Sequence, residues 1–247
     1  QDDCEGALLI DADNAFNRLN RRGMLRTIQF RCPRLALYAI NTYRVAVRLF
    51  VGTRELLSEE GTTQGDPLGT CMYAIGIWPI ISLLSDKEPP DRMISLPERR
   101  STPSTLQVWF ADDGSLVGPF NELRELWDRL IVIGPPLGYF PKASNTVLIA
   151  KSGLEGRANC AFAGSDVQVT DEDSRHLGAA LGSLAFRAKF LKDRESSWVR
   201  QLSLLAEVGR KDPHAAQAAF VRGFRAKWNY ILRTIPDASD YLKAIDL

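Results

Sequence analysis

The sequence predicts an α+β domain followed by a region of helices. Up to about residue 170, short apolar runs typical of buried strands alternate with segments that have the apolar spacing of helices. Beyond Ser174 the spacing is helical. The chain has 247 residues, 45% of them hydrophobic and 25% charged, which suffices for one large domain or two smaller ones around a sizeable core. We expect two domains, over residues 1–170 and 171–247.

The N-terminal part carries signals for a strand, two helices and a hairpin. The apolar run of GALLIDADNAF predicts a buried strand that ends near Asp11. Helical spacing follows over residues 21–43, and Pro33 breaks this segment into two pieces. The alternating residues of RVAVRLFVGTRELLSEEG predict a hairpin that turns around Gly52.

The middle of the chain combines a buried helix, a loop and a second hairpin. The apolar stretch over residues 67–84 predicts a helix that is kinked or ended near Pro79. Residues 86–105 hold four prolines among charged residues, which is typical of a loop. Residues 106–118 predict a hairpin whose turn contains the two aspartates of FADDG.

The rest of the chain is mainly helical. NELRELWDRLIVIG predicts an amphipathic helix that Asn121 caps and Gly134 ends, since two prolines follow directly. NTVLIAK and DVQVT predict short strands. Helices are expected over residues 187–208 and 213–234, and Pro213 suits the first turn of the second one.

Basic residues gather in two stretches, although the formal net charge is only +1. The stretch from Arg18 to Arg54 contains nine arginines and no acidic residue. The stretch from Arg187 to Arg233 contains eleven basic and four acidic residues. Such segregation suits a polyanion bound at defined places. It suits solvated helix faces equally well, because mixed charges are common on helices, and both interpretations stay open.

Several classes of protein are disfavoured by the composition. No apolar run is long enough to span a membrane, and neither a basic n-region nor a cleavage site opens the chain. The four cysteines lie far apart without CxxC spacing, so reduced thiols in an intracellular protein, cytoplasmic or nuclear, are expected. Because the first residue is Gln1, we expect a piece of a longer polypeptide.

Two neighbouring acids, Asp112 and Asp113, directly follow an apolar run. Taken alone, Asp-Asp-Gly is ordinary turn chemistry, and a solvated turn is the simplest interpretation. However, Asp11 also follows an apolar run, and two such strand ends could meet on neighbouring strands. Three converging carboxylates repel one another unless a divalent cation lies between them, and oxygen ligands favour Mg²⁺ or Mn²⁺. Two such ions serve nucleotidyl transfer.

Four segments occur in the order and spacing of motifs A, B, C and D of reverse transcriptases: LLIDADNAFNRLN, GTTQGDPLG, FADDG and LGYFPKASNTVLIAK. SRHLGAALGS resembles the segment from motif E to the thumb. The chain therefore resembles a retroelement reverse transcriptase of the non-LTR or DIRS-like retrotransposon type, clearly over about residues 7–185. The resemblance implies a right-hand palm with a ferredoxin-like antiparallel sheet, part of the fingers within residues 18–60, and a helical thumb, with the fingers mostly absent.

The resemblance implies a catalytic set of three carboxylates that bind two Mg²⁺ ions, or Mn²⁺ in their place: Asp11, Asp112 and Asp113. The backbone carbonyl of Ala12 would be a further metal ligand. Phe16 matches the aromatic residue that lies under the sugar and excludes a ribose 2′-hydroxyl by its bulk. Taken alone, a phenylalanine is more often a core residue.

Further residues match positions around the substrate. Gln64 and Gly65 match the motif B pair beside the incoming nucleotide and template, although a tight turn explains the glycine equally well. Motif D departs from the family, because Asn145 stands where a lysine is common and cannot act as a general acid. Lys142 and Lys151 are the nearest lysines, and we assign Lys142 to the substrate-binding set.

The expected function is that of an RNA-directed DNA polymerase that adds deoxynucleotides to a primer. Its partners would be an RNA or DNA template, a primer strand and deoxynucleoside triphosphates, held partly by phosphate contacts from the basic C-terminal helices. Three aromatic residues of these helices either stack on nucleic acid or pack the helices together: Trp198, Trp228 and Tyr230. The alternative is a non-catalytic nucleic-acid-binding relic of a retroelement polymerase.

Overall fold

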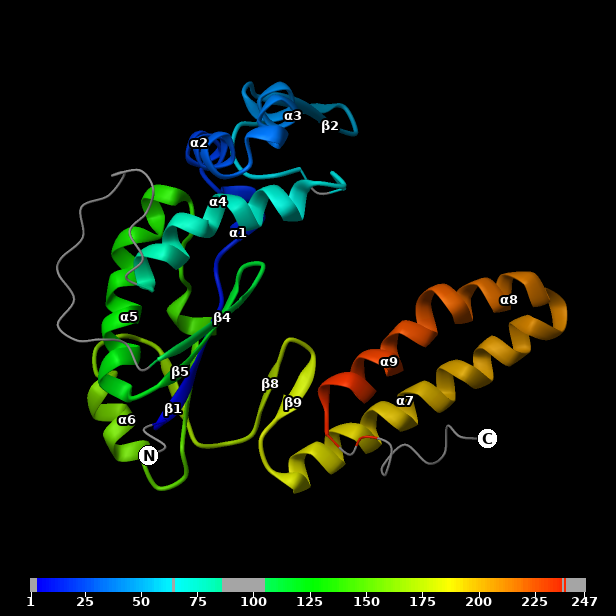
Figure 1. Ribbon diagram of the computed structural model, residues 1–247. Helices are drawn as coiled ribbons and strands as arrows, with labels where there is room; N and C mark the ends of the chain where they lie inside the picture. Colours follow the sequence, from blue (N-terminus) through cyan, green and yellow to red (C-terminus); the bar gives the residue numbers. More distant parts are fainter. Residues whose placement is uncertain (1–3, 64, 86–104, 237, 239–247) are drawn as a thin grey trace. The chain divides into compact units, whose positions relative to one another are not determined.

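The computed structural model describes residues 4–63, 65–85, 105–236 and 238. The chain divides into two compact units, Gln1–Asp171 and Glu172–Leu247 (Figure 1). The first contains a five-stranded sheet with helices and a separate hairpin, and the second is mainly helical. Among the described residues, no helix combines the length and the apolar character needed to cross a membrane.

The sheet of the first unit has the strand order β4-β5-β1-β6-β7. Its strands, in chain order, are β1 (Gly6–Ile10), β4 (Leu106–Phe110), β5 (Asp113–Gly118), β6 (Val147–Ala150) and β7 (Gln168–Thr170). The first four pair antiparallel, whereas β7 pairs parallel to β6. The α+β class is thus confirmed, but the expected antiparallel sheet is mixed, because the chain crosses over through a helix between β6 and β7.

Six α-helices, two short 3₁₀-helices (Pro135–Leu137 and Ala143–Asn145) and a separate hairpin complete the described part of the first unit. The α-helices are α1 (Ala15–Arg18), α2 (Arg21–Arg31), α3 (Pro33–Tyr43), α4 (Gly69–Leu84), α5 (Phe120–Ile133) and α6 (Glu155–Ala161). Strands β2 (Val47–Val51) and β3 (Arg54–Ser58) pair antiparallel and turn at Gly52. The predicted split at Pro33 and the hairpin around Gly52 are confirmed.

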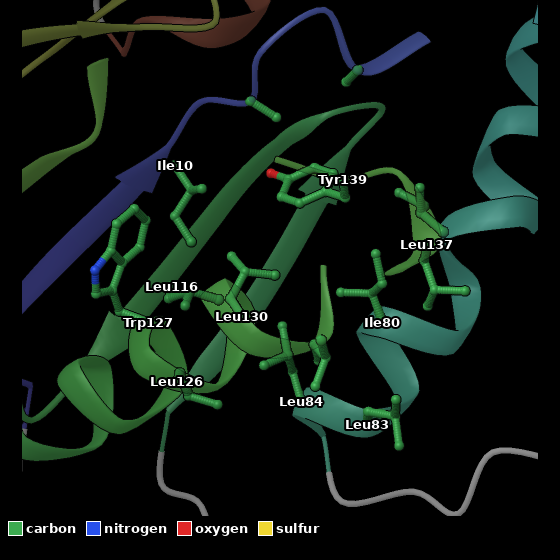
Figure 2. Close-up of a cluster of buried hydrophobic side chains, with 14 of the residues drawn as sticks. Ile10, Ile80, Leu83, Leu84, Leu116, Leu126, Trp127, Leu130, Leu137 and Tyr139 are labelled. Carbon is green, nitrogen blue, oxygen red and sulfur yellow. The ribbon is translucent and has the colours of Figure 1, made fainter. Parts of the chain in front are cut away.

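One face of the sheet is buried under helices. Figure 2 shows Ile10 and Leu116 of the strands beside Trp127 and Leu130 of α5, with side chains of α4 such as Ile80 in the same cluster. The opposite face carries apolar side chains of β4 that are more than half exposed, namely Leu106, Val108 and Phe110. The sheet therefore has one core face and one face that presents side chains outward.

The structure decides between two predicted ends of one helix and contradicts the predicted cap of another. Helix α4 passes through Pro79 and ends at Leu84, because burial of its apolar side chains outweighs the loss of one backbone hydrogen bond. Helix α5 begins at Phe120, so Asn121 lies inside it and is not its cap. Instead, the Glu5 carboxylate accepts a hydrogen bond from the Phe120 amide at 2.9 Å, a contact between residues far apart in the sequence.

The second unit begins with strands that the helical spacing does not predict. Strands β8 (Ser174–His176) and β9 (Ala179–Leu181) form a hairpin whose turn places Leu177 and Gly178 at positive φ. The helical elements are α7 (Leu184–Lys211), α8 (Pro213–Ala219), a π-helical turn (Phe220–Phe224) and α9 (Arg225–Thr234). The helical character is confirmed over residues 184–234, but the expectation of helical structure directly after Ser174 is wrong.

The aromatic residues of the second unit mostly pack its helices together. Trp198 is buried, and its ring meets those of Phe224 and Trp228 edge to face. Tyr230 is partly exposed, and its hydroxyl donates to the Leu177 carbonyl of the hairpin. The packing role is therefore confirmed for the two tryptophans.

Candidate functional site

Asp11 and Asp113 lie beside each other at the end of the sheet. Ile10 of β1 pairs with Gly114 of β5, so the next residue along β1 reaches the neighbourhood of Asp113. The Ile10 side chain points into the core, and alternation therefore places Asp11 on the opposite, outward face. Asp113 pairs with Phe110, whose side chain is 67% exposed on that same face. Two predicted catalytic carboxylates thus share one face.

The tight turn between β4 and β5 brings the third carboxylate to this end of the sheet. Ala111 has a positive φ of 55°, an uncommon conformation for a residue with a side chain, and Asp112 completes the turn. The Tyr139 hydroxyl donates to the Asp112 carbonyl at 2.8 Å. Asp113 is the first residue of β5 and not, as expected, part of the turn. The Asp112 backbone is therefore held by Tyr139, and the Asp113 backbone is held by its pairing with Phe110.

The segment around Asp11 is held by the chain that follows Gly138. The Lys142 amide donates to the Asp11 carbonyl at 2.9 Å, and Ala12 pairs with Pro141. The Asn145 side-chain amide donates to Asp11 Oδ2 at 2.7 Å. Asn145 was predicted only to replace a lysine, and its contact with Asp11 was missed because the two residues are 134 positions apart.

The charges of the three aspartates influence one another. Burial raises the pKa of the Asp113 carboxyl above its usual value, and the negative charges of Asp112 and then Asp11 raise the pKa further. All three carboxylates therefore lie in one electrostatic neighbourhood. Repulsion of this kind is what a bound cation would relieve.

Asp113→Asn is expected to raise the melting temperature at pH 7, because it removes a partly buried negative charge beside two others. The pKa of Asp113 is higher in the folded state than the ordinary 3.8, so its ionisation destabilises the fold at neutral pH. The gain should shrink as the pH falls and vanish well below pH 3.8, where the carboxyl is protonated in both the folded and the unfolded state. Thermal melts of both proteins from pH 3 to 8 would measure this, and a gain that persists at pH 3 would contradict it.

Phe16 is half-buried, and its ring stacks on that of Tyr73. The ring centroids are 4.2 Å apart and the planes differ by 21°. Phe16 also packs against the main core cluster, so it is a core aromatic. In the sequence it follows Asp11 by five residues. Tyr73 lies in α4 and was not selected from the sequence, where nothing distinguishes it from other apolar-face residues of the helix.

The motif B segment turns just before α4. Gln64 lies outside the described residues. Gly65 has a φ of 94°, and an added side chain would meet nothing within 4 Å, so conformation and not crowding calls for glycine. The Asp66 carboxylate accepts hydrogen bonds from the hydroxyls of Tyr43 at 2.5 Å and Tyr38 at 3.2 Å. The turn reading of Gly65 is thereby confirmed.

Asp66 is a structural anchor that the sequence did not reveal. Burial tends to raise its pKa, but the hydrogen bonds from Tyr43, the Leu68 amide and Tyr38 outweigh burial, and the pKa lies below its usual value. The carboxylate is therefore charged at neutral pH and fixes the start of α4. This matters for the site because α4 carries Tyr73.

The carboxylates are not arranged as a complete metal centre. In the part of the chain that the structure describes, no group of three or more His, Cys, Asp or Glu side chains is positioned to hold a metal ion. The donors at the sheet end, however, are all oxygen atoms, which is the donor chemistry of Mg²⁺ and Mn²⁺ and not of zinc. Lys142, the lysine assigned to substrate, has an exposed side chain near this end, next to the Asp11 backbone.

The comparisons with known proteins leave the family open. No protein-family model and no curated protein matches the chain. Among solved structures, the chain is similar to telomerase from Candida albicans, solved in complex with a fragment of telomeric RNA. The TM-score is 0.40 at 12% sequence identity, and the match covers 88% of this chain and 40% of the telomerase chain. At that score the similarity decides neither the fold nor the function of this chain.

Proposed function

We propose that the chain is the palm and thumb portion of an RNA-directed DNA polymerase of the retroelement type. The observation that carries the proposal is that Asp11, Asp112 and Asp113 come together at one end of the sheet. These residues come from two strands about a hundred positions apart, and the reverse-transcriptase motifs require that they meet. The segments that resemble motifs B and D occur in the expected order along the sequence and add support.

In the proposed reaction, the carboxylates hold two Mg²⁺ ions, which would activate the primer 3′-hydroxyl and neutralise the departing pyrophosphate. Asp11 and Asp113 face outward from the sheet. In this proposal they would hold the ions together with Asp112 and the Ala12 carbonyl. Phe16 would limit the space at the sugar and so favour deoxynucleotides. The basic residues of the second unit would contact phosphates of the primer–template duplex without reading its sequence.

A second candidate is a nucleic-acid-binding protein that has lost the reaction. The observation in its favour is the hydrogen bond from Asn145 to Asp11 Oδ2. This bond occupies one of the carboxylate oxygens, and asparagine cannot supply the proton that a lysine would at this position. The two candidates share the nucleic-acid partner and differ in whether metal-dependent chemistry occurs.

The test is primer extension on an RNA template with deoxynucleotides, at several Mg²⁺ and Mn²⁺ concentrations. Metal-dependent extension that disappears in Asp112→Asn supports the polymerase. Extension that survives this substitution contradicts it. Salt-sensitive RNA binding without any extension selects the second candidate. If the chain neither extends a primer nor binds RNA, both candidates are wrong.

A further inference from the structure

The phenol of Tyr73 stands at the boundary between the core and the predicted site. Tyr73 is 1% exposed, and its ring stacks on the Phe16 ring with the two ring centroids 4.2 Å apart. Burial raises the pKa of the Tyr73 hydroxyl most, and the negative charges of Asp112 and Asp113 raise it further. Tyr73 therefore stacks on Phe16 and lies within electrostatic range of the two aspartates.

The hydroxyl of Tyr73 is buried without a hydrogen-bond partner among the described residues. Buried polar groups are nearly always paired, and an unpaired one destabilises a fold. Its neighbour Tyr139 is also buried, yet its hydroxyl donates to the Asp112 carbonyl. A phenylalanine at position 73 would fill the same core without that cost, so the packing of the core alone does not explain a tyrosine here.

The backbone of Phe16 is fixed independently of its ring. The Thr62 amide donates to the Phe16 carbonyl at 2.8 Å. A side chain at Gly61 would come within 2.3 Å of the same carbonyl oxygen, so the two segments are in close contact. With the backbone held in this way, the direction of the Phe16 ring depends on what packs against its faces, and Tyr73 stacks on one of them.

We propose that Tyr73 is a positioning residue for Phe16, and that the preference of the site for deoxynucleotides over ribonucleotides depends on the Tyr73 ring. The inference rests on the proposed polymerase function and adds a residue to its sugar selection. Phe16 can exclude a 2′-hydroxyl only where its ring is held still. Loss of the supporting ring lets Phe16 turn into the vacated space and admits the hydroxyl.

The test compares incorporation of a deoxynucleotide and the matching ribonucleotide by the whole chain. Tyr73→Leu and Tyr73→Met remove the aromatic face but keep a large apolar side chain, and either one suffices if the other does not fold. Each is expected to lower the ratio of kcat/KM for the two nucleotides by about tenfold, mainly through a lower KM for the ribonucleotide. Tyr73→Phe keeps the ring and is expected to retain the preference and melt no lower than the native chain.

The control is Ile77→Ala, one turn further along α4 and buried in the same core cluster. It should lower the melting temperature without changing the sugar preference, which separates positioning from general loss of packing. A preference that is unchanged in both ring-less variants, or changed equally in Ile77→Ala, overturns the inference while the polymerase function stands. A native chain that shows no extension overturns the proposed function and this inference with it.

Discussion

Asp11→Asn is expected to reduce primer extension at least about 10³-fold, which corresponds to about 4 kcal/mol of lost transition-state stabilisation. The amide has the size of the carboxylate but carries no charge, so it is a poor ligand for Mg²⁺. Its side-chain oxygen can still accept the hydrogen bond from Asn145, and the fold should not suffer. Removal of a negative charge near Asp113 even relieves a repulsion.

Asp13→Asn provides the matched control for this prediction. Asp13 lies two residues further along the same segment, but its carboxylate pairs with Arg18 at 2.6 Å on the surface. An exposed pair of this kind contributes little to stability, and extension should stay within a factor of about three of the native rate. Extension rates and thermal melts of both variants decide the matter. Equal losses of activity in the two variants would mean that Asp11 has no special role.

The elements of the first unit were largely predictable because their signals are local. An apolar run that ends at Asp11 predicts a strand. Pro33 separates two helices and Gly52 forms a hairpin turn, as the backbone chemistry of proline and glycine predicts. What failed depended on distant partners. Glu5 takes the capping role that the sequence suggested for Asn121, and no local pattern links Glu5 to Phe120.

The placement of the three aspartates at one end of the sheet was predictable from the sequence, whereas the residues that contact them were not. Asp11, Asp112 and Asp113 lie at or next to strand ends, which the apolar runs mark. Tyr73 and Asn145 contact this set only because α4 and the segment after Gly138 fold against it. Those contacts depend on tertiary packing, which neither the spacing nor the composition of a single sequence encodes visibly.

Gly138→Ala is expected to destabilise the chain by at least about 3 kcal/mol. Gly138 has a φ of 83°, and an added Cβ would lie 2.1 Å from the Arg18 carbonyl oxygen and 2.4 Å from the Asn20 amide nitrogen. Both contacts are with backbone, which cannot rotate away as a side chain can. The Asn20 amide also donates to the Leu137 carbonyl, so the two segments would have to separate and lose this bond.

Gly153→Ala isolates the conformational part of this effect. Gly153 has nearly the same φ, 82°, but an added side chain there would meet nothing within 4 Å. Gly153→Ala should lower the free energy of unfolding by only about 1–2 kcal/mol, which is the strain of an alanine in the left-handed conformation. Urea unfolding of both variants measures the difference. Equal losses in the two variants would show that the close approach at Gly138 is unimportant.

The consequence of Gly138→Ala extends to the site, because the residues that follow it carry the contacts to the aspartate segments. The Tyr139 hydroxyl holds the Asp112 carbonyl, and the Phe140 carbonyl accepts from the Asp13 amide. If the segment shifts, the Asp11 and Asp112 backbones lose a shared support. In Gly138→Ala the rate of primer extension should then fall by more than the loss of folded protein explains. In Gly153→Ala the extension rate and the folded fraction should fall by the same factor.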